Sequence, residues 1–348
     1  MQKNTRNKVV AGIAVGIALS IAVPAAIATL YQPGFFSNLF ASKSNELTVV
    51  THDSVAFPKE LLADFKKETG ITVKQLKAGD AGAMLNKLVL TKDSPIGDMV
   101  YGIDNTFLST ADAADIAEPA GEGYDKEKFV EIDFADVCLN YDKEWFAKNE
   151  SAPPTSMADL TKPEYKGLTV LTNPTTSSPG LAFLATTVTV FGESGWQQYW
   201  QALKANDVKI DAGWEDAYFT DFSGSSGKGA YPIVLSYSSS PAFEIRDNGE
   251  SQTASLLNEC FRQFEFAAIL KNGKNTVGAN KFIAFMLEKK FQASLPDANY
   301  VYPVRSDVKL PKTWAEFAPA AIKTIGNESI AAKRKSWFAA WSDIFAIN

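Results

Sequence analysis

The segment Thr175–Gly180 combines hydroxyl side chains with the start of a predicted helix. Its sequence is Thr-Thr-Ser-Ser-Pro-Gly, in which Ser178 is a good N-cap residue and Pro179 fits the first helical position. Backbone N–H groups at such a helix start, together with the hydroxyls of Thr176, Ser177 and Ser178, can bind an anion with help from the helix dipole. The same pattern also begins helices that bind nothing, so both interpretations stay open.

A second turn of this kind is Gly79-Asp80-Ala81-Gly82, between a predicted strand and a predicted helix. Glycine lets the backbone approach a ligand closely, and the helix start again offers N–H donors. Asp80 can accept a hydrogen bond from a ligand amine, or it can cap the helix. For an isolated motif of this type, capping is the commoner use.

Aromatic residues stand at several predicted loop edges: Trp214, Tyr237, Phe243, Tyr300 and Tyr302. Aromatic faces in such places can stack on a flat heterocycle and attract a cation. Packing in the core or at a hinge is the commoner use of each one taken singly.

The residue types of most catalytic and metal centres are scarce. The chain has one histidine, His52, and two cysteines, Cys138 and Cys260. This inventory argues against a His/Cys metal site and against a Cys–His or Ser–His catalytic centre. His52 ends the first predicted strand, where a ligand can sit, but it has no evident catalytic partner in the sequence. Neither a metal nor a cofactor is expected.

Composition bounds the remaining possibilities. The chain has 348 residues, of which 46% are hydrophobic, enough for about two domains. A net charge of −6 argues against a general nucleic-acid binder, which needs a basic surface to meet phosphates. A locally positive pocket for a small anion remains compatible with that charge.

Strands and helices alternate along the first part of the chain. Apolar runs predict strands at 47–51, 71–76 and 98–103, with helices at 58–70 and 82–92 between them. A second unit begins with a short strand at 136–140 and continues through a helix from Ser178 to Phe191. This order is typical of an α/β fold whose ligand groups lie at the carboxyl ends of strands. Trp337 and Trp341, on a last helix at 330–345, are expected to be core residues.

The N-terminus reads as an export signal. Lys3, Arg6 and Lys8 precede an uncharged apolar run from Val9 to Tyr31, with small residues at Ala26 and Ala28. Residues 1–31 are therefore a cleaved signal peptide or an uncleaved membrane anchor, and 32–46 are a tether. In an oxidising compartment the two cysteines either form a disulfide or stay as two buried thiols.

These pieces together resemble the thiamine and thiamine-phosphate binding proteins of ABC importers. The resembling segments cover nearly everything from Leu47 onward: 47–54, 80–88, 98–105, 140–143, 173–180, 213–218, 234–242 and 300–304. The Gly-Trp, Leu-Ser-Tyr and Tyr-Pro-Val pieces are the most specific.

The resemblance implies a two-lobe periplasmic-binding-protein fold with hinge strands. Lobe 1 would comprise 47–135 plus 266–348, and lobe 2 would comprise 136–265. Cys138 and Cys260 would then lie beside the two crossover segments, which favours a disulfide between them.

The resemblance also implies roles for individual residues. Trp214, Tyr237 and Tyr300 would stack on or enclose the pyrimidine and thiazolium rings, and Phe243 would line the same wall. Asp80 would hydrogen-bond the ligand, with Ala81 and Gly82 bringing the backbone close, while Ser177 and Ser178 would meet phosphate oxygens. His52 stands where relatives often place tyrosine, Tyr300 where they often place tryptophan, and Phe243 replaces a tyrosine.

The implied function is a non-enzymatic, extracytoplasmic receptor, expected to be a monomer. It would capture thiamine, thiamine monophosphate or thiamine diphosphate and deliver it to an ABC permease in the membrane. The departures leave the preferred form open. The alternatives are a binding protein of the same fold for ferric iron or a polyamine, and a secreted enzyme.

Overall fold

The computed structural model describes residues 45–121, 127–226, 228–321, 324 and 330–346. By its internal contacts the chain divides into two units, Met1–Ser44 and Asn45–Asn348, and every element below belongs to the second. The predicted signal or anchor segment and residues 32–44 of the tether lie outside the described residues. Within the described part of the chain, no helix is both long and apolar enough to cross a membrane.

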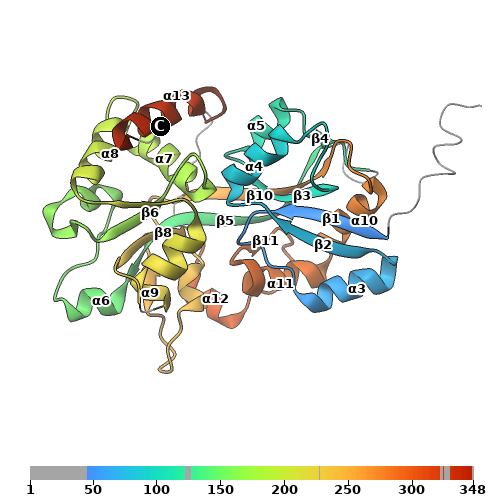
Figure 1. Cartoon of the computed structure of the whole chain (residues 1–348). Coiled ribbons are helices and arrows are strands. Elements are labelled where there is room, and N and C mark those ends of the chain that lie inside the picture. Colours follow the sequence, from blue (N-terminus) through green and yellow to red (C-terminus); the bar gives the residue numbers. More distant parts are fainter. Residues whose placement is uncertain (1–44, 122–126, 227, 322–323, 325–329, 347–348) are drawn as a thin grey trace, which may run out of the picture. The chain divides into compact units, whose positions relative to one another are not determined.

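The strands carry the labels of Figure 1. They are β1 (Glu46–Thr51), β2 (Thr72–Lys77), β3 (Met99–Asp104), β4 (Ala117–Glu118), β5 (Phe129–Asp142), β6 (Thr169–Thr172), β7 (Lys209–Asp211), β8 (Ile233–Tyr237), β9 (Thr253–Ser255), β10 (Phe261–Leu270) and β11 (Tyr302–Pro303).

The α-helices are α3 (Lys59–Thr69), α4 (Ala81–Leu90), α5 (Leu108–Ala113), α6 (Lys143–Lys148), α7 (Ser178–Phe191), α8 (Trp196–Ala205), α9 (Ser223–Ser226), α10 (Thr276–Met286), α11 (Lys289–Asn299), α12 (Lys312–Phe317) and α13 (Ile330–Phe345). Short 3-10 turns are η1 (Met157–Thr161), η2 (Pro163–Tyr165) and η4 (Ser240–Phe243), and η3 (Asp216–Asp221) is a π-helical turn.

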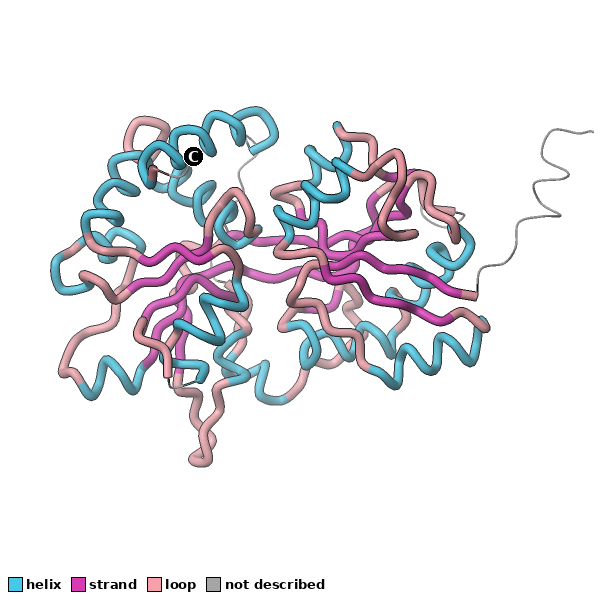
Figure 2. Tube along the Cα trace, in the orientation of Figure 1, coloured by secondary structure: helices cyan, strands magenta, loops and turns pink. Residues whose placement is uncertain are grey.

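One sheet connects two groups of parallel strands, in the order β2-β1-β3-β10-β5-β8-β6-β7. Strands β1, β2 and β3 form one group, and β6, β7 and β8 form the other. The long strands β5 and β10 pair with each other in antiparallel fashion and run from one group into the other, as Figure 2 shows. The fold is therefore the expected two-lobed α/β arrangement. We call the half with β1–β3 lobe 1 and the half with β6–β8 lobe 2.

Helices cover both faces of the sheet. In Figure 1, α4, α5, α7, α8 and α13 lie above the strands, and α3, α6, α9, α11 and α12 lie below them. Because both faces are covered, a central strand can bury apolar side chains on both sides: in β1, Val49 packs into one core cluster and Val50 into the other. α3 ends where predicted, at Gly70, which caps it with a positive φ of 76°.

α13 packs against α8 of lobe 2, with the rings of Trp341 and Trp200 5.8 Å apart. Trp337 and Trp341 are buried, which confirms their prediction as core residues. Arg334 of the same helix lies over the ring of Phe107 in lobe 1, 5.5 Å from its centroid. We keep the expected lobe boundaries as a proposal, with one change. Because α13 packs on α8, we assign α13 to lobe 2 and not to lobe 1.

Two local expectations were wrong. The strand expected at 136–140 is the end of the 14-residue strand β5. Acidic residues at Glu131, Asp133 and Asp136 interrupt its apolar pattern, and the partners of the buried ones cannot be read from the sequence. The N-cap of α7 is Ser177, one residue before the expected Ser178, and Pro179 is the second helical residue.

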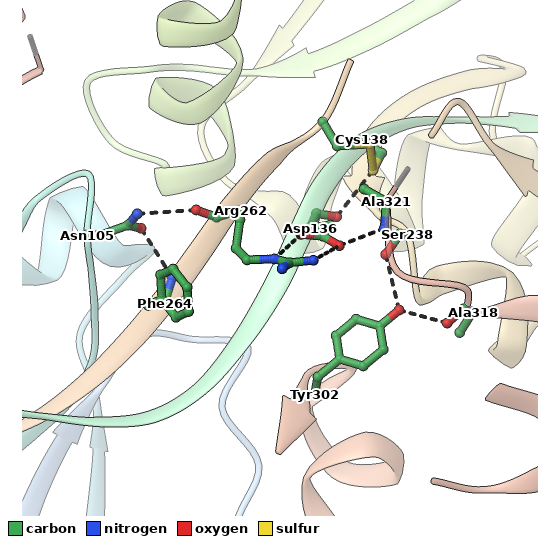
Figure 3. Close-up of polar contacts among 10 residues, drawn as sticks. Asn105, Asp136, Cys138, Ser238, Arg262, Phe264, Tyr302, Ala318 and Ala321 are labelled. Carbon is green, nitrogen blue, oxygen red and sulfur yellow. Dashed lines mark hydrogen bonds and ion pairs between the residues drawn. A yellow bond between two sulfur atoms is a disulfide. The ribbon is translucent and has the colours of Figure 1, made fainter. Parts of the chain in front are cut away.

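The crossing between lobes is fixed by an ion pair whose carboxylate is fully buried (Figure 3). Arg262 of β10 donates through Nε and Nη2 to the two carboxylate oxygens of Asp136 on β5, at 2.8 and 2.9 Å. The backbone N–H of Ala321 donates to the same carboxylate at 2.8 Å. Asn105 bridges the next residues of β10, accepting from Phe264 N–H and donating to the Arg262 carbonyl.

Replacing Arg262 with alanine is expected to lower the free energy of unfolding by about 3–5 kcal/mol, because it leaves the fully buried Asp136 carboxylate without its counter-charge. Urea unfolding measures this. Arg246→Ala is the matched control: Arg246 pairs with Glu144 at the surface, so its loss should cost about 1 kcal/mol or less. Equal small losses in both variants would contradict the prediction.

Cys138 and Cys260 form a disulfide. It joins β5 to the residue just before β10, inside lobe 2 and beside the crossing, as the resemblance implied (Figure 3). The two cysteines are 122 residues apart in the sequence and both are buried.

Candidate ligand-binding site

The structure brings four of the sequence-predicted aromatic residues together. The ring centroid of Trp214 lies 5.7 Å from that of Tyr237 and 5.9 Å from that of Tyr300. Phe243 stacks on Tyr300 with 3.6 Å between ring centroids. Tyr302 does not join them: its hydroxyl donates to the Ala318 carbonyl in a core cluster that contacts this group through Phe243.

Trp214 is held on three sides. Its backbone N–H donates to Oδ2 of Asp80 at 2.9 Å, a contact from lobe 2 to lobe 1. Its indole Nε1 donates to Oγ of Ser236 at 2.9 Å. Its ring stacks on Tyr218, with centroids 4.9 Å apart and planes 17° apart. The sequence analysis missed Tyr218, although its spacing of four residues from Trp214 in a helical segment was a usable signal.

A cavity of about 230 Å³ opens beside this aromatic group. Four predicted site residues line it: His52, Trp214, Tyr237 and Tyr300. The sequence analysis missed the other lining groups, among which Lys77, Glu215, Phe219 and Glu265 carry charge or a ring. No motif marked them, because the fold collects them from segments that lie far apart in the sequence.

The cavity has an acidic surrounding. Burial raises the pKa of Tyr237 well above its usual value, and four nearby carboxyl groups raise it further, those of Glu265, Asp80, Asp104 and Asp133. Burial also raises the pKa of Asp104 to about 6. Such a surrounding favours a positively charged ligand over a negative one.

His52 is the basic side chain that lies among these acids. Its Nε2 lies 3.3 Å from Oε1 of Glu265. Burial disfavours the charged imidazole, but Glu265, Asp80 and Asp104 outweigh this and raise the pKa of His52 above its ordinary value.

The Asp80 turn caps a helix, as the commoner interpretation predicted. Asp80 is the N-cap of α4 and its Oδ1 accepts from the Ala81 N–H at 2.6 Å, while Oδ2 serves Trp214. Burial raises the pKa of Asp80, although His52 and these backbone donors oppose that rise.

The other predicted residues lie where the starts of α4 and α7 meet across the lobes. The N–H groups of Gly82 and Ala83 donate to the carbonyl of Thr176 at 3.0 and 3.2 Å. A Cβ at Gly82 would stand 2.9 Å from that carbonyl oxygen, so only glycine permits this approach.

Ser177 and Ser178 are both buried at this contact. Oγ of Ser178 accepts from Gln263 at 3.0 Å. The Ser177 hydroxyl makes no hydrogen bond of normal geometry, although it lies near enough to Asp80 to lower the pKa of that carboxyl. The predicted site thus falls into two parts: an aromatic group with a cavity, and a junction of two helix starts.

Comparison with known proteins identifies the family. Residues 103–332 match the family described as bacterial extracellular solute-binding protein. The thiamine-binding periplasmic protein of Salmonella typhimurium is 31% identical over 311 residues, covering 85% of this chain and 92% of its own. A solved periplasmic thiamin binding protein is 28% identical with a TM-score of 0.75, covering 86% of this chain and 96% of its own.

A more distant structure shares the fold alone. The apo ferric ion-binding protein A of Pasteurella haemolytica is 17% identical with a TM-score of 0.69, over 88% of this chain and 99% of its own. The family match, the similarity to these relatives and the two lobes joined by hinge strands agree with one another. The chain belongs to the family of bacterial extracellular solute-binding proteins.

Proposed function

We propose that this protein binds thiamine or one of its phosphate esters between its lobes, as a monomer, and delivers it to an ABC permease without making or breaking a bond. The observation that carries the proposal is the aromatic group of Trp214, Tyr237, Tyr300 and Phe243 beside an acid-surrounded cavity. A thiazolium ring is flat and permanently positive, so it gains from both aromatic faces and nearby carboxylates. The relatives named for thiamine binding support the same ligand.

Binding requires the lobes to move. Ligand pockets for small molecules usually measure about 300–1,000 Å³, and the cavity here is smaller, about 230 Å³. The contacts from Trp214 to Asp80 and from Gly82 to Thr176 join the two lobes directly. Opening at the β5–β10 hinge would break both contacts and admit the ligand, and closure would then desolvate the stacked rings.

Two arrangements argue against the ferric-iron alternative. Tyr300 stacks on Phe243, whereas the Tyr302 hydroxyl is occupied by the Ala318 carbonyl, so the pair does not converge on one ion. The described residues contain no group of three or more His, Cys, Asp or Glu side chains placed to hold a metal ion.

Calorimetric titration of the purified protein with thiamine, its monophosphate and its diphosphate tests the proposal. We expect tight binding to at least one of the three and no turnover of either ester. Tighter binding of an ester than of thiamine would support a phosphate subsite at Ser177 and Ser178. Folded protein that binds none of the three would refute the ligand assignment.

A further inference from the structure

The His52–Glu265 pair lies on the wall of the cavity that the proposed ligand would occupy. Both side chains line the cavity, and they are 14% and 12% exposed. His52 directly follows β1 in lobe 1, and Glu265 lies on the hinge strand β10. The pair is thus accessible from the cavity but largely removed from bulk water, where a charge interaction is strong.

The imidazole of His52 is confined to this place. Gly102 of β3 lies directly behind it, with a φ of 100°, and a Cβ there would come within 2.3 Å of Cδ2 of His52. The charged groups that act on the imidazole come from three elements and are all acidic: Glu265 of β10, Asp80 at the cap of α4, and Asp104 of β3. The ring therefore stays in an acidic environment with little room to rotate away.

Few basic side chains are placed to pair with Glu265 in the described part of the cavity. Among the described residues, the basic side chains lining the cavity are His52 and Lys77, and the Lys77 ammonium donates to the Asp53 carbonyl instead. Across the strand pair Glu265 stands opposite Asp133, whose Oδ2 accepts from the Tyr101 hydroxyl. Burial, and next the charge of Glu265, raise the pKa of Asp133 well above its usual value, which favours its neutral form. In the described part of the cavity, His52 is the basic side chain that meets the Glu265 carboxylate.

We infer that Glu265 is the residue that selects a permanently cationic ligand, and that the His52 imidazolium occupies this carboxylate until the ligand arrives and displaces its proton. The inference rests on the proposed function, because thiamine supplies the fixed positive charge. A ligand cation beside Glu265 repels the imidazolium, so His52 becomes neutral in the complex. Binding then releases one proton to solvent, and no covalent bond changes.

The sign of the pH dependence follows from this exchange. The pKa of His52 is raised above about 6.5 in the free protein and would be lower in the complex. Thiamine affinity is therefore greatest above the free-protein pKa and falls as the pH decreases through it. Thiamine affinity falls by at most about tenfold per pH unit. It stops falling once the pH is below the pKa that His52 has in the complex.

Imidazole NMR on wild-type protein tests the inference without any substitution. His52 is the only histidine in the chain, so protein prepared without a histidine tag gives a single set of imidazole signals. We expect its titration midpoint to lie above about 6.5 in the free protein and to move down by about one unit or more with saturating thiamine. Calorimetry in two buffers of different ionisation enthalpy, at a pH between the two midpoints, should show about half a proton released per thiamine bound for a one-unit shift and nearer one proton for a larger shift.

Two variants separate the roles of the pair. In His52→Gln the proton release and the pH dependence should disappear, and thiamine affinity at pH 6 should rise above that of the wild type. Glu265→Gln should bind thiamine about 10- to 100-fold more weakly. The same variant should bind the neutral thiophene analogue of thiamine, which lacks the quaternary nitrogen, within about threefold of the wild type.

Glu244→Gln is the control for other titrating groups. Burial raises the pKa of Glu244 to about 7, and its carboxylate accepts from the Tyr218 hydroxyl, apart from the described residues that line the cavity. This variant should keep the pH dependence. Thiamine binding that is independent of pH, with an unmoved imidazole titration, would overturn the inference while leaving the proposed function intact. Failure to bind any thiamine compound would remove the proposed function and the inference with it.

Discussion

Replacing Trp214 with alanine is expected to raise the dissociation constant for thiamine by about 10- to 100-fold. The indole ring is rigidly placed by Ser236 and Tyr218, so it can stack on a flat cation at little entropic cost. Stacking and cation–π contacts to a desolvated ring are worth roughly 2 kcal/mol or more, and about 1.4 kcal/mol corresponds to tenfold. The substitution keeps the backbone N–H that bridges to Asp80, so the loss reports on the ring.

Titration calorimetry at constant pH measures this loss. Trp145→Ala is the matched control, because Trp145 lies on α6 and packs against Phe146, apart from the residues that line the cavity. Trp214→Phe should recover part of the affinity, since it keeps a smaller aromatic face. A correctly folded Trp214→Ala protein with wild-type affinity would remove Trp214 from the site.

The double variant Cys138→Ser, Cys260→Ser is expected to lose about 4–5 kcal/mol of stability. The disulfide closes a loop spanning a sequence separation of 122 residues, and in the chain-entropy model such a loop restricts the unfolded state by about that amount. Guanidinium unfolding of the variant, compared with the wild type with and without reductant, measures the change. Thiamine affinity should be nearly preserved, since neither sulfur lines the cavity.

The comparison with reduced wild-type protein is the internal control. Reduction and substitution should shift the unfolding midpoint by similar amounts, because both remove the same cross-link. A variant as stable as the oxidised wild type would show that the unfolded chain gains little freedom when the bond is lost. A variant destabilised far beyond the reduced protein would point to the serine hydroxyls in the core.

Local sequence patterns predicted most elements, because their causes are local. The β-branched run of β1 and the glycine that ends α3 are examples, and both appear where expected. The full length of β5 was not predictable, because its buried carboxylates are tolerated only through partners far along the chain. Asp133 pairs with Tyr101 and Asp136 with Arg262.

The residues of the candidate site likewise divide into those that local sequence could predict and those that depend on the tertiary fold. Aromatic residues at loop edges could be recognised one by one, and the resemblance placed Trp214, Tyr237, Phe243 and Tyr300 in one wall. Glu265 could not be predicted as a site residue, since a single glutamate within a strand forms no recognisable motif. Its role follows from its contact with His52, which only the fold creates. The direct contact of Gly82 with Thr176 likewise depends on how far the lobes close, which is a tertiary property.

The packing of α13 on α8 has a consequence for biogenesis. An exported chain emerges from the translocation channel with its N-terminal part first, so Trp200 of lobe 2 reaches the far side of the membrane well before Trp341 can cover it. Lobe 2 therefore cannot complete its apolar core until α13 has crossed as well. A prematurely terminated product lacking α13 would present an uncovered apolar face to extracytoplasmic chaperones and proteases, even though its residues at the cavity are complete.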